Sequence, residues 1–111
     1  MLDWKGYATE LKSKIGQIGK LNPDVVKGYA TIANAKTAAP KLDAKTRELI
    51  SLAVAVTTRC DGCIVTHTDA AKRAGATKEE IVEALGVAVA LNAGAALVYS
   101  ARVVDAYDGL E

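Results

Sequence analysis

The sequence is poor in aromatic residues, in cysteine and in net charge of either sign. Its 111 residues include no phenylalanine, one tryptophan and four tyrosines, although half of all residues are hydrophobic. The hydrophobic side chains are therefore mainly alanine, valine, leucine and isoleucine, which suit close packing between helices. The formal net charge is +1, with acidic and basic residues interspersed. This pattern lacks the basic patch of a nucleic-acid-binding surface or of a segment that binds anionic membranes.

No targeting or membrane-spanning segment is expected. The N-terminal segment 1–6 lacks a basic stretch followed by an apolar run, which a signal peptide requires. The most apolar window, 85–100, contains Asn92 and two glycines, and we expect it to be too short and too interrupted to cross a bilayer. The length predicts a single domain over residues 1–111. We expect a cytoplasmic protein, in a compartment where thiols are kept reduced.

Hydrophobic residues recur at helical spacing almost throughout the chain, so we predict an all-α bundle of about six helices. Asn22 and Pro23 mark one helix start, and Thr77 with Glu80 has the pattern of a capping box. We expect Asn92 and Gly94 to break the last apolar stretch into two helices. The predicted helices are Trp4 to about Lys20, Pro23 to about Thr37, Asp43 to about Thr58, the Cys60–Cys63 turn to about Arg73, Thr77 to about Leu91, and a final helix after Gly94.

The segment 87–104 is apolar on nearly all sides of a helix. Such a helix is normally buried all round. A chain of this length has difficulty burying it alone, so we predict a homo-oligomer with these helices packed between subunits. The alternative is a central helix in the core of a monomer.

All thiol and imidazole groups of the chain lie within eight residues, because Cys60, Cys63 and His67 are its only cysteines and its only histidine. A Cys-x-x-Cys pair closes too short a loop to stabilise a fold appreciably. This favours a catalytic or metal-binding role. Cys63 is predicted in the first turn of a helix, where backbone amides and the helix dipole favour a thiolate. His67 lies four residues later, on the same helix face.

Glu48 is the carboxylate that the predicted topology can bring to His67. Along a continuous helix it lies about 18 Å from Cys60, so it cannot touch that sulfur. The chain turns after this helix and the next helix runs back, so Glu48 can reach His67 directly or through a water. A carboxylate in that position orients and charges a catalytic histidine. Either cysteine could then attack a peroxide or a disulfide, and the other could resolve the product.

Each of these residues also has a simpler interpretation. Glu48 could be a solvated helix residue beside Lys45 and Arg47, and His67 could be structural. The cysteines could be inert small hydrophobic residues. The two cysteines and His67 could also supply three zinc ligands, with Glu48 or a water as the fourth, although the chain has no further cysteine or histidine. We expect no metal and no cofactor.

The segment from Leu42 to Leu85 resembles the carboxymuconolactone decarboxylase-like family, and within it the AhpD-like alkylhydroperoxidase branch. The shared pattern is Glu48, eleven residues, Cys60-x-x-Cys63-Ile-x-x-His67, and then Ala74-Gly75-Ala76-Thr77-x-Glu79-Glu80-Ile81. The resemblance implies an all-α fold and a homo-oligomer, commonly a trimer or a hexamer. It also implies a redox pair in a proton relay with Glu48 and His67, in which Cys63 attacks the peroxide and Cys60 resolves it.

The resemblance further implies a hydroperoxide substrate and a dithiol electron donor, such as a lipoyl-carrying or thioredoxin-like protein. Gly62 stands where peroxidase members often have a second histidine, so the relay is one group shorter here. Two other functions stay open. One is a lyase of the decarboxylase type, for which Arg59 and Arg102 are candidates to hold a substrate carboxylate. The other is a non-enzymatic redox sensor that uses the same disulfide.

Overall fold

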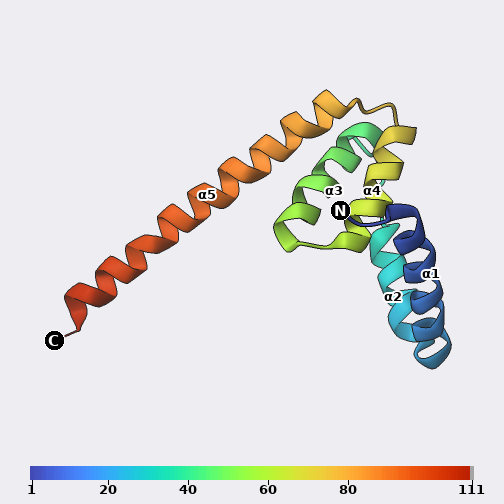
Figure 1. The fold of residues 1–111 in the computed structure, drawn as a ribbon, viewed down its shortest axis with the longest axis horizontal. Helices are drawn as coiled ribbons and strands as arrows, with labels where there is room; N and C mark the ends of the chain where they lie inside the picture. The colour runs from blue at the N-terminus through green and yellow to red at the C-terminus, as the bar shows by residue number, and fades with distance from the viewer. Residues whose placement is uncertain (111) are drawn as a thin grey trace. The chain divides into compact units, whose positions relative to one another are not determined.

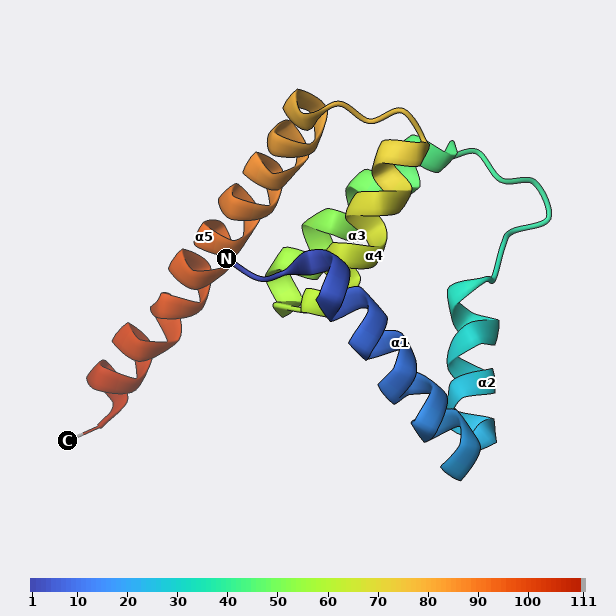
Figure 2. The same ribbon diagram turned by 45° about the vertical axis from the view of Figure 1, so that its right-hand side comes forward.

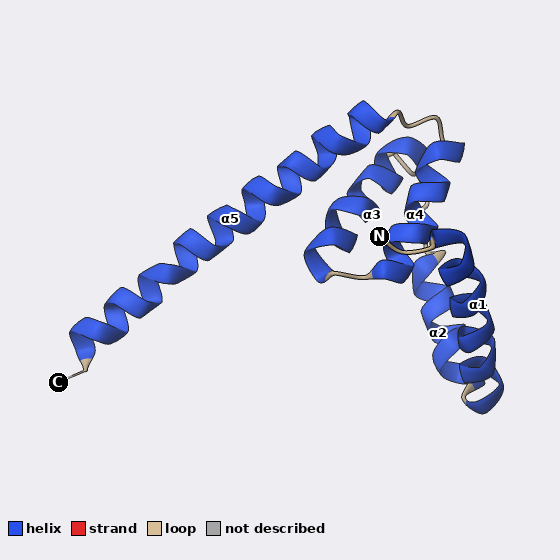
Figure 3. Cartoon of the chain, viewed as in Figure 1, coloured by secondary structure: helices blue, strands red, loops and turns tan. Residues whose placement is uncertain are grey.

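A computed structural model describes residues 1–110. The regular secondary structure of these residues is all α-helix, joined by turns and loops and with no strand among them, as the sequence predicted (Figure 1, Figure 3). Five helices occur in the described residues rather than about six. Their bounds are α1 Trp4–Leu21, α2 Pro23–Ala33, α3 Ala44–Thr58, α4 Asp61–Arg73 and α5 Lys78–Gly109. The chain divides into two compact units, one of residues 1–44 and one from Lys45 onward.

The first unit is a helical hairpin of α1 and α2 (Figure 2). Asp3 caps α1, because its Oδ1 accepts the Gly6 backbone N–H at 3.2 Å. Helix α2 ends at Ala33 rather than near Thr37, so the predicted end is wrong. The Ala30 carbonyl accepts both the Asn34 backbone N–H at 3.0 Å and the Asn34 side-chain amide at 2.8 Å, so Asn34 closes the end of the helix.

In the second unit, α3 and α4 are joined by a tight turn that holds the first cysteine. Arg59 adopts the left-handed conformation, with φ of 55°, directly after α3. The Cys60 N–H then donates back to the Ala55 carbonyl at 3.0 Å, which closes the helix end as a Schellman motif does. Glycine usually takes the left-handed position, so Arg59 is a strained choice immediately before Cys60.

Helix α5 begins at the predicted capping box, with Thr77 Oγ1 accepting from the Glu80 N–H and the Glu80 carboxylate accepting from the Thr77 N–H, both at 3.1 Å. The predicted break at Asn92 and Gly94 is wrong, since the helix continues to Gly109. The Asn92 amide donates to the Ala88 carbonyl at 2.7 Å and to Thr57 Oγ1 at 2.8 Å. Its polar group is therefore satisfied without leaving the helix.

Because α5 is uninterrupted, the expectation that the apolar window is too short and too interrupted to cross a bilayer is also wrong. Among the described residues, α5 is the one helix long and apolar enough to do so by length and composition. The core helix of a soluble protein can have the same length and apolar composition. These two properties alone are therefore not evidence that α5 crosses a membrane.

Two polar contacts hold α5 against α3. Lys45 Nζ lies 2.7 Å from the Glu80 carboxylate, and Thr57 Oγ1 accepts from Asn92. Both contacts join residues that are 35 positions apart, one pair near the start of the two helices and the other pair further along both. The two helices therefore run in the same direction. The buried residues of this unit are small or aliphatic: Leu52, Ala55, Ala71 and Ala88.

Past Asn92, the rest of α5 is largely uncovered within this chain. The exposed fractions of Leu97 and Val98 are 76% and 75%, and those of Val103 and Val104 are 71% and 62%. The apolar C-terminal half of α5 thus has no covering surface in the described chain.

Candidate redox site

Cys60 and Cys63 are joined by a disulfide at the start of α4. Their Cα atoms are 5.2 Å apart, within the roughly 7 Å that a disulfide can bridge. Both residues are half-buried. The predicted proximity of the two sulfurs is confirmed.

The cysteines occupy two distinct positions at the N-terminus of α4. Cys60 is the N-cap residue, and its Sγ accepts the Cys63 backbone N–H at 3.1 Å. A serine or aspartate oxygen usually fills this role, and here a sulfur does. Cys63 is in the first turn, as predicted, and the Ile64 N–H donates to the Cys60 carbonyl at 2.9 Å. Both sulfurs therefore lie where the helix dipole favours negative charge.

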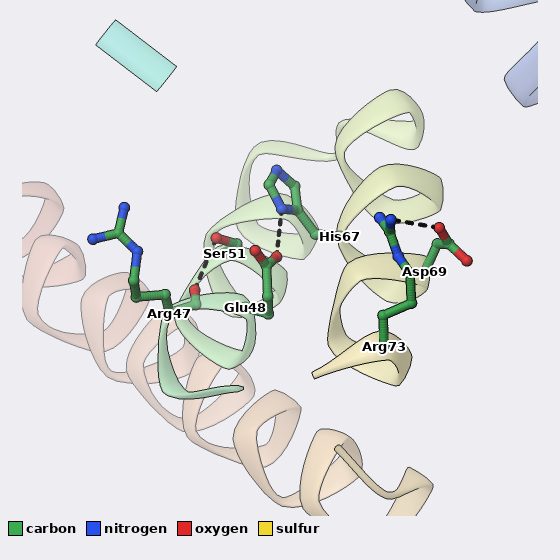
Figure 4. A network of polar contacts seen from close by, with 6 residues as sticks. All are labelled: Arg47, Glu48, Ser51, His67, Asp69 and Arg73. Carbon is green, nitrogen blue, oxygen red and sulfur yellow. Dashed lines mark hydrogen bonds and ion pairs between the residues drawn. The ribbon is translucent and has the colours of Figure 1, made fainter. Parts of the chain in front are cut away.

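Glu48 on α3 and His67 on α4 are in direct contact across the helix pair (Figure 4). Glu48 Oε2 and His67 Nδ1 are 2.6 Å apart, and the side chains are 23% and 32% exposed. No bridging water is needed. Since an ionised carboxylate only accepts, the proton lies on Nδ1, and Nε2 is left as the nitrogen that can take or give a proton.

The charged neighbours of this pair are directed elsewhere. The Arg47 side chain points away from Glu48 and His67 (Figure 4), and its carbonyl accepts from the Ser51 hydroxyl at 2.9 Å. Lys45 lies against Glu80. Glu48 is thus a half-buried partner of His67 rather than a solvated helix residue among cations.

Along α4, Asp69 and Arg73 form an exposed ion pair of 3.2 Å that does not include His67 (Figure 4). Of the residues considered for a carboxylate-binding role, Arg59 is exposed in the turn before Cys60. Arg102 donates to the Tyr99 hydroxyl at 3.2 Å and lies over the Tyr99 ring at 4.9 Å. Its guanidinium is already engaged on α5.

Residues 1–110 contain no cluster of three or more histidine, cysteine, aspartate or glutamate side chains arranged to hold a metal ion. In this oxidised state the two sulfurs are bonded to each other.

The sequence did not predict the left-handed conformation of Arg59 or the contact of Asn92 with Thr57. An asparagine in an otherwise apolar helix was the available signal for the second, because a polar group there needs a partner.

The all-α fold is similar to folds that are already known. The model of the carboxymuconolactone decarboxylase family matches residues 23–106, and this chain belongs to that family. A solved relative is the crystal structure of a carboxymuconolactone decarboxylase family protein from Legionella pneumophila. It has a TM-score of 0.73 and 33% identity, over 95% of this chain and 94% of that chain.

Other relatives have similar sequences over most of their length. An uncharacterized protein from Haemophilus influenzae is 49% identical over 105 residues, covering 95% of this chain and 93% of its own. Uncharacterized protein 4 in the cox locus of Paracoccus denitrificans is 35% identical over 98 residues, covering 86% of this chain and 88% of its own length. A solved protein from Methanobacterium thermoautotrophicum has a TM-score of 0.67 and 32% identity, covering 76% of this chain and 94% of that chain.

Proposed function

We propose that this protein is a thiol-disulfide oxidoreductase that reduces hydroperoxides through Cys60 and Cys63, with Glu48 and His67 as the proton relay. The observation that carries the proposal is the combination of a disulfide at the helix start with a histidine one turn later, held by a carboxylate at 2.6 Å. A thiol pair can cycle between two redox states, and a fixed imidazole supplies and removes the protons that cycling requires.

In the proposed reaction, His67 Nε2 takes the proton of the reduced Cys63 thiol. The Cys63 thiolate attacks one peroxide oxygen, the O–O bond breaks, and the alcohol leaves with the proton from the imidazolium. Cys63 is then a sulfenic acid. The Cys60 thiolate attacks that sulfur and expels hydroxide, which is protonated to water, and the disulfide forms.

A dithiol donor completes the cycle by reducing the disulfide, and is itself oxidised to a disulfide. A lipoyl-carrying or thioredoxin-like protein has this chemistry, and a cytoplasmic location would keep it reduced. We also propose that residues 1–111 act as one family domain, since the matched range begins in α2 and ends in α5.

The proposal is tested by counting free thiols in the reduced protein before and after one equivalent of an alkyl hydroperoxide. Two thiols should be lost per chain, and mass spectrometry should find a disulfide between Cys60 and Cys63. The mixture should then consume peroxide repeatedly when a dithiol such as dithiothreitol is present. A protein that keeps both thiols after peroxide addition would rule out the proposed reaction.

Two alternatives are separated by the same measurements. A redox sensor would form the disulfide but would consume little peroxide with any dithiol. A lyase of the decarboxylase type, suggested by the family name, would act on a lactone acid and retain that activity in the Cys63→Ser variant. The lyase would need a cation to hold a carboxylate. The Arg102 guanidinium already contacts Tyr99, so Arg59, which is exposed before Cys60, would be the candidate.

A further inference from the structure

The turn between α3 and α4 places an arginine in a conformation that glycine usually occupies. Arg59 has a φ of 55°, and Gly75, in the turn after α4, has a φ of 86°. In both turns the following residue donates its backbone N–H to a carbonyl five positions earlier. A Cβ atom makes the left-handed conformation unfavourable, and glycine has none. A less favourable residue beside Cys60 therefore points to a function of its side chain.

The Arg59 side chain is exposed and has no acidic partner within residues 1–110. The ion pairs of these residues are Lys45–Glu80, His67–Glu48 and Arg73–Asp69. The planar guanidinium can bind a carboxylate through two parallel hydrogen bonds, which a lysine ammonium cannot do. Arg59 is thus a cation that is left open to an anion from outside the chain.

This cation lies directly beside the disulfide, because consecutive Cα atoms are about 3.8 Å apart. A reductant extends beyond its reacting sulfur, so an acidic group on it can pair with Arg59 while its thiol reaches the disulfide. The nearby acids do not cancel this attraction. Asp61 lies in the first turn of α4, where the positive end of the helix dipole offsets its charge. The Glu48 carboxylate is in contact with His67 at 2.6 Å.

We propose that Arg59 selects an anionic reductant for the Cys60–Cys63 disulfide, by pairing with an acidic group that lies close to the thiols of the reductant. This inference rests on the proposed function, because it names the chemical class of the dithiol donor. Arg59 forms no covalent bond in the exchange. It is a specificity-determining residue that raises the local concentration of an anionic donor and lowers that of a cationic one.

The exchange that Arg59 assists is balanced in atoms and electrons. A donor thiolate bonds to one sulfur of the disulfide, the S–S bond breaks, and the other sulfur leaves as a thiolate. The second donor thiolate then breaks the mixed disulfide and releases the remaining cysteine. Two electrons pass from the donor to the protein, and the donor leaves as a disulfide.

The proposal is tested by reducing the oxidised protein with two thiols of similar size and opposite charge, 3-mercaptopropionate and cysteamine. The ratio of their second-order rate constants measures the charge selection, and intrinsic differences between the thiols cancel when variants are compared. Arg59→Gln should lower the ratio of 3-mercaptopropionate to cysteamine by about threefold or more. High salt should lower the wild-type ratio in the same direction, since it screens exposed charges. A ratio that Arg59→Gln leaves unchanged would overturn the proposal.

Two variants are the matched controls for position. Arg47→Gln removes the same charge from an exposed side chain that points away from Glu48 and His67 (Figure 4), and should leave the ratio unchanged. Asp61→Asn removes the negative charge that follows Cys60 and should raise the ratio. An equal fall of the ratio in Arg47→Gln and Arg59→Gln would assign the effect to net charge and contradict a local role.

Arg59→Gly separates the side chain from the backbone conformation. Glycine accepts the left-handed conformation, so this variant should unfold at a higher urea concentration than Arg59→Gln. Its charge selection should nevertheless be as low as that of Arg59→Gln. A glycine variant with the wild-type ratio would show that no guanidinium is needed.

These measurements use no peroxide, so the two proposals can fail separately. Peroxide turnover without charge selection would overturn this inference alone. Charge selection in a protein that does not consume peroxide would overturn the proposed function alone.

Discussion

Glu48 Oε2 and His67 Nδ1 lie 2.6 Å apart although the two residues are 19 positions apart in the sequence. The contact links α3 to α4 and fixes which imidazole nitrogen is free. In the proposed reaction the free Nε2 handles the Cys63 proton, while Glu48 stabilises the imidazolium that forms. In that proposed reaction, the pair has a role that neither residue would have alone.

The first prediction concerns this pair. Replacing Glu48 with glutamine, or His67 with glutamine, should lower peroxide turnover by about 100-fold or more, the scale of losing a general base. Asp69→Asn is the matched control, since Asp69 is an exposed carboxylate on α4 that pairs with Arg73. Steady-state peroxide consumption with dithiothreitol measures all three. Full activity in Glu48→Gln would show that the contact is structural.

The second prediction is that the chain forms an obligate homo-oligomer, a trimer or a hexamer, through the C-terminal half of α5. Its apolar side chains are more than half exposed in the single chain, as Leu97 at 76% illustrates. A patch of that kind exceeds what soluble surfaces usually tolerate. Light scattering at micromolar concentration should therefore give a multiple of 11.6 kDa. A mass of one chain would refute the prediction.

A substitution at Ala95 tests the same interface. Ala95→Glu should dissociate the oligomer and lower activity together, because an unpaired charge would enter a dry contact. Ala35→Glu adds the same charge at an exposed position outside α5 and should leave the mass unchanged. An Ala95→Glu protein that keeps its mass would place the interface elsewhere.

The fourth prediction concerns the contact of Thr57 with Asn92. Thr57→Val keeps the shape of the side chain and removes the hydroxyl, and should cost about 1 kcal/mol of unfolding free energy. Thr57→Ser, which keeps the hydroxyl, is the control. Urea unfolding of Thr57→Val in the wild-type and Asn92→Ala backgrounds measures the coupling free energy between the two side chains. The loss of unfolding free energy caused by Thr57→Val should largely disappear once the Asn92 side chain is absent. An unchanged cost would assign the effect to the local bond from Thr57 to Ala53.

The fifth prediction follows from Glu80. The hydrogen bond from Lys45, and then that from the Thr77 backbone, lowers the pKa of the Glu80 carboxyl in the folded protein below its ordinary value. Since the pKa is lower when folded, the stabilisation is present above the unfolded pKa of about 4.3 and is lost as the pH falls through the folded value.

Glu80→Gln keeps an acceptor for the capping box but loses the charge that pairs with Lys45. Wild type should be more stable than this variant at pH 7, and the difference should shrink toward pH 3. Urea unfolding at both pH values measures it. If the stability difference between wild type and Glu80→Gln is the same at both pH values, the ion pair contributes nothing to stability.

The sequence by itself determined the features that depend on neighbouring residues. The start of α2 at Pro23, the capping box of α5 and the extents of α3 and α4 follow from caps and hydrophobic spacing within a few residues. Cys60, Cys63 and His67 also share one helix start, so their placement needed only the helical repeat. These parts were predicted correctly because their energetics are local.

Tertiary structure decided the features that depend on distant partners. Asn92 was expected to break a helix, but Thr57, which accepts from it, lies 35 residues away and lets α5 continue. The direct bond of Glu48 to His67 required α3 and α4 to be packed at a particular spacing, which no local pattern specifies. A polar side chain takes the conformation that its hydrogen-bond partner permits, and only the fold supplies a partner that is remote in sequence.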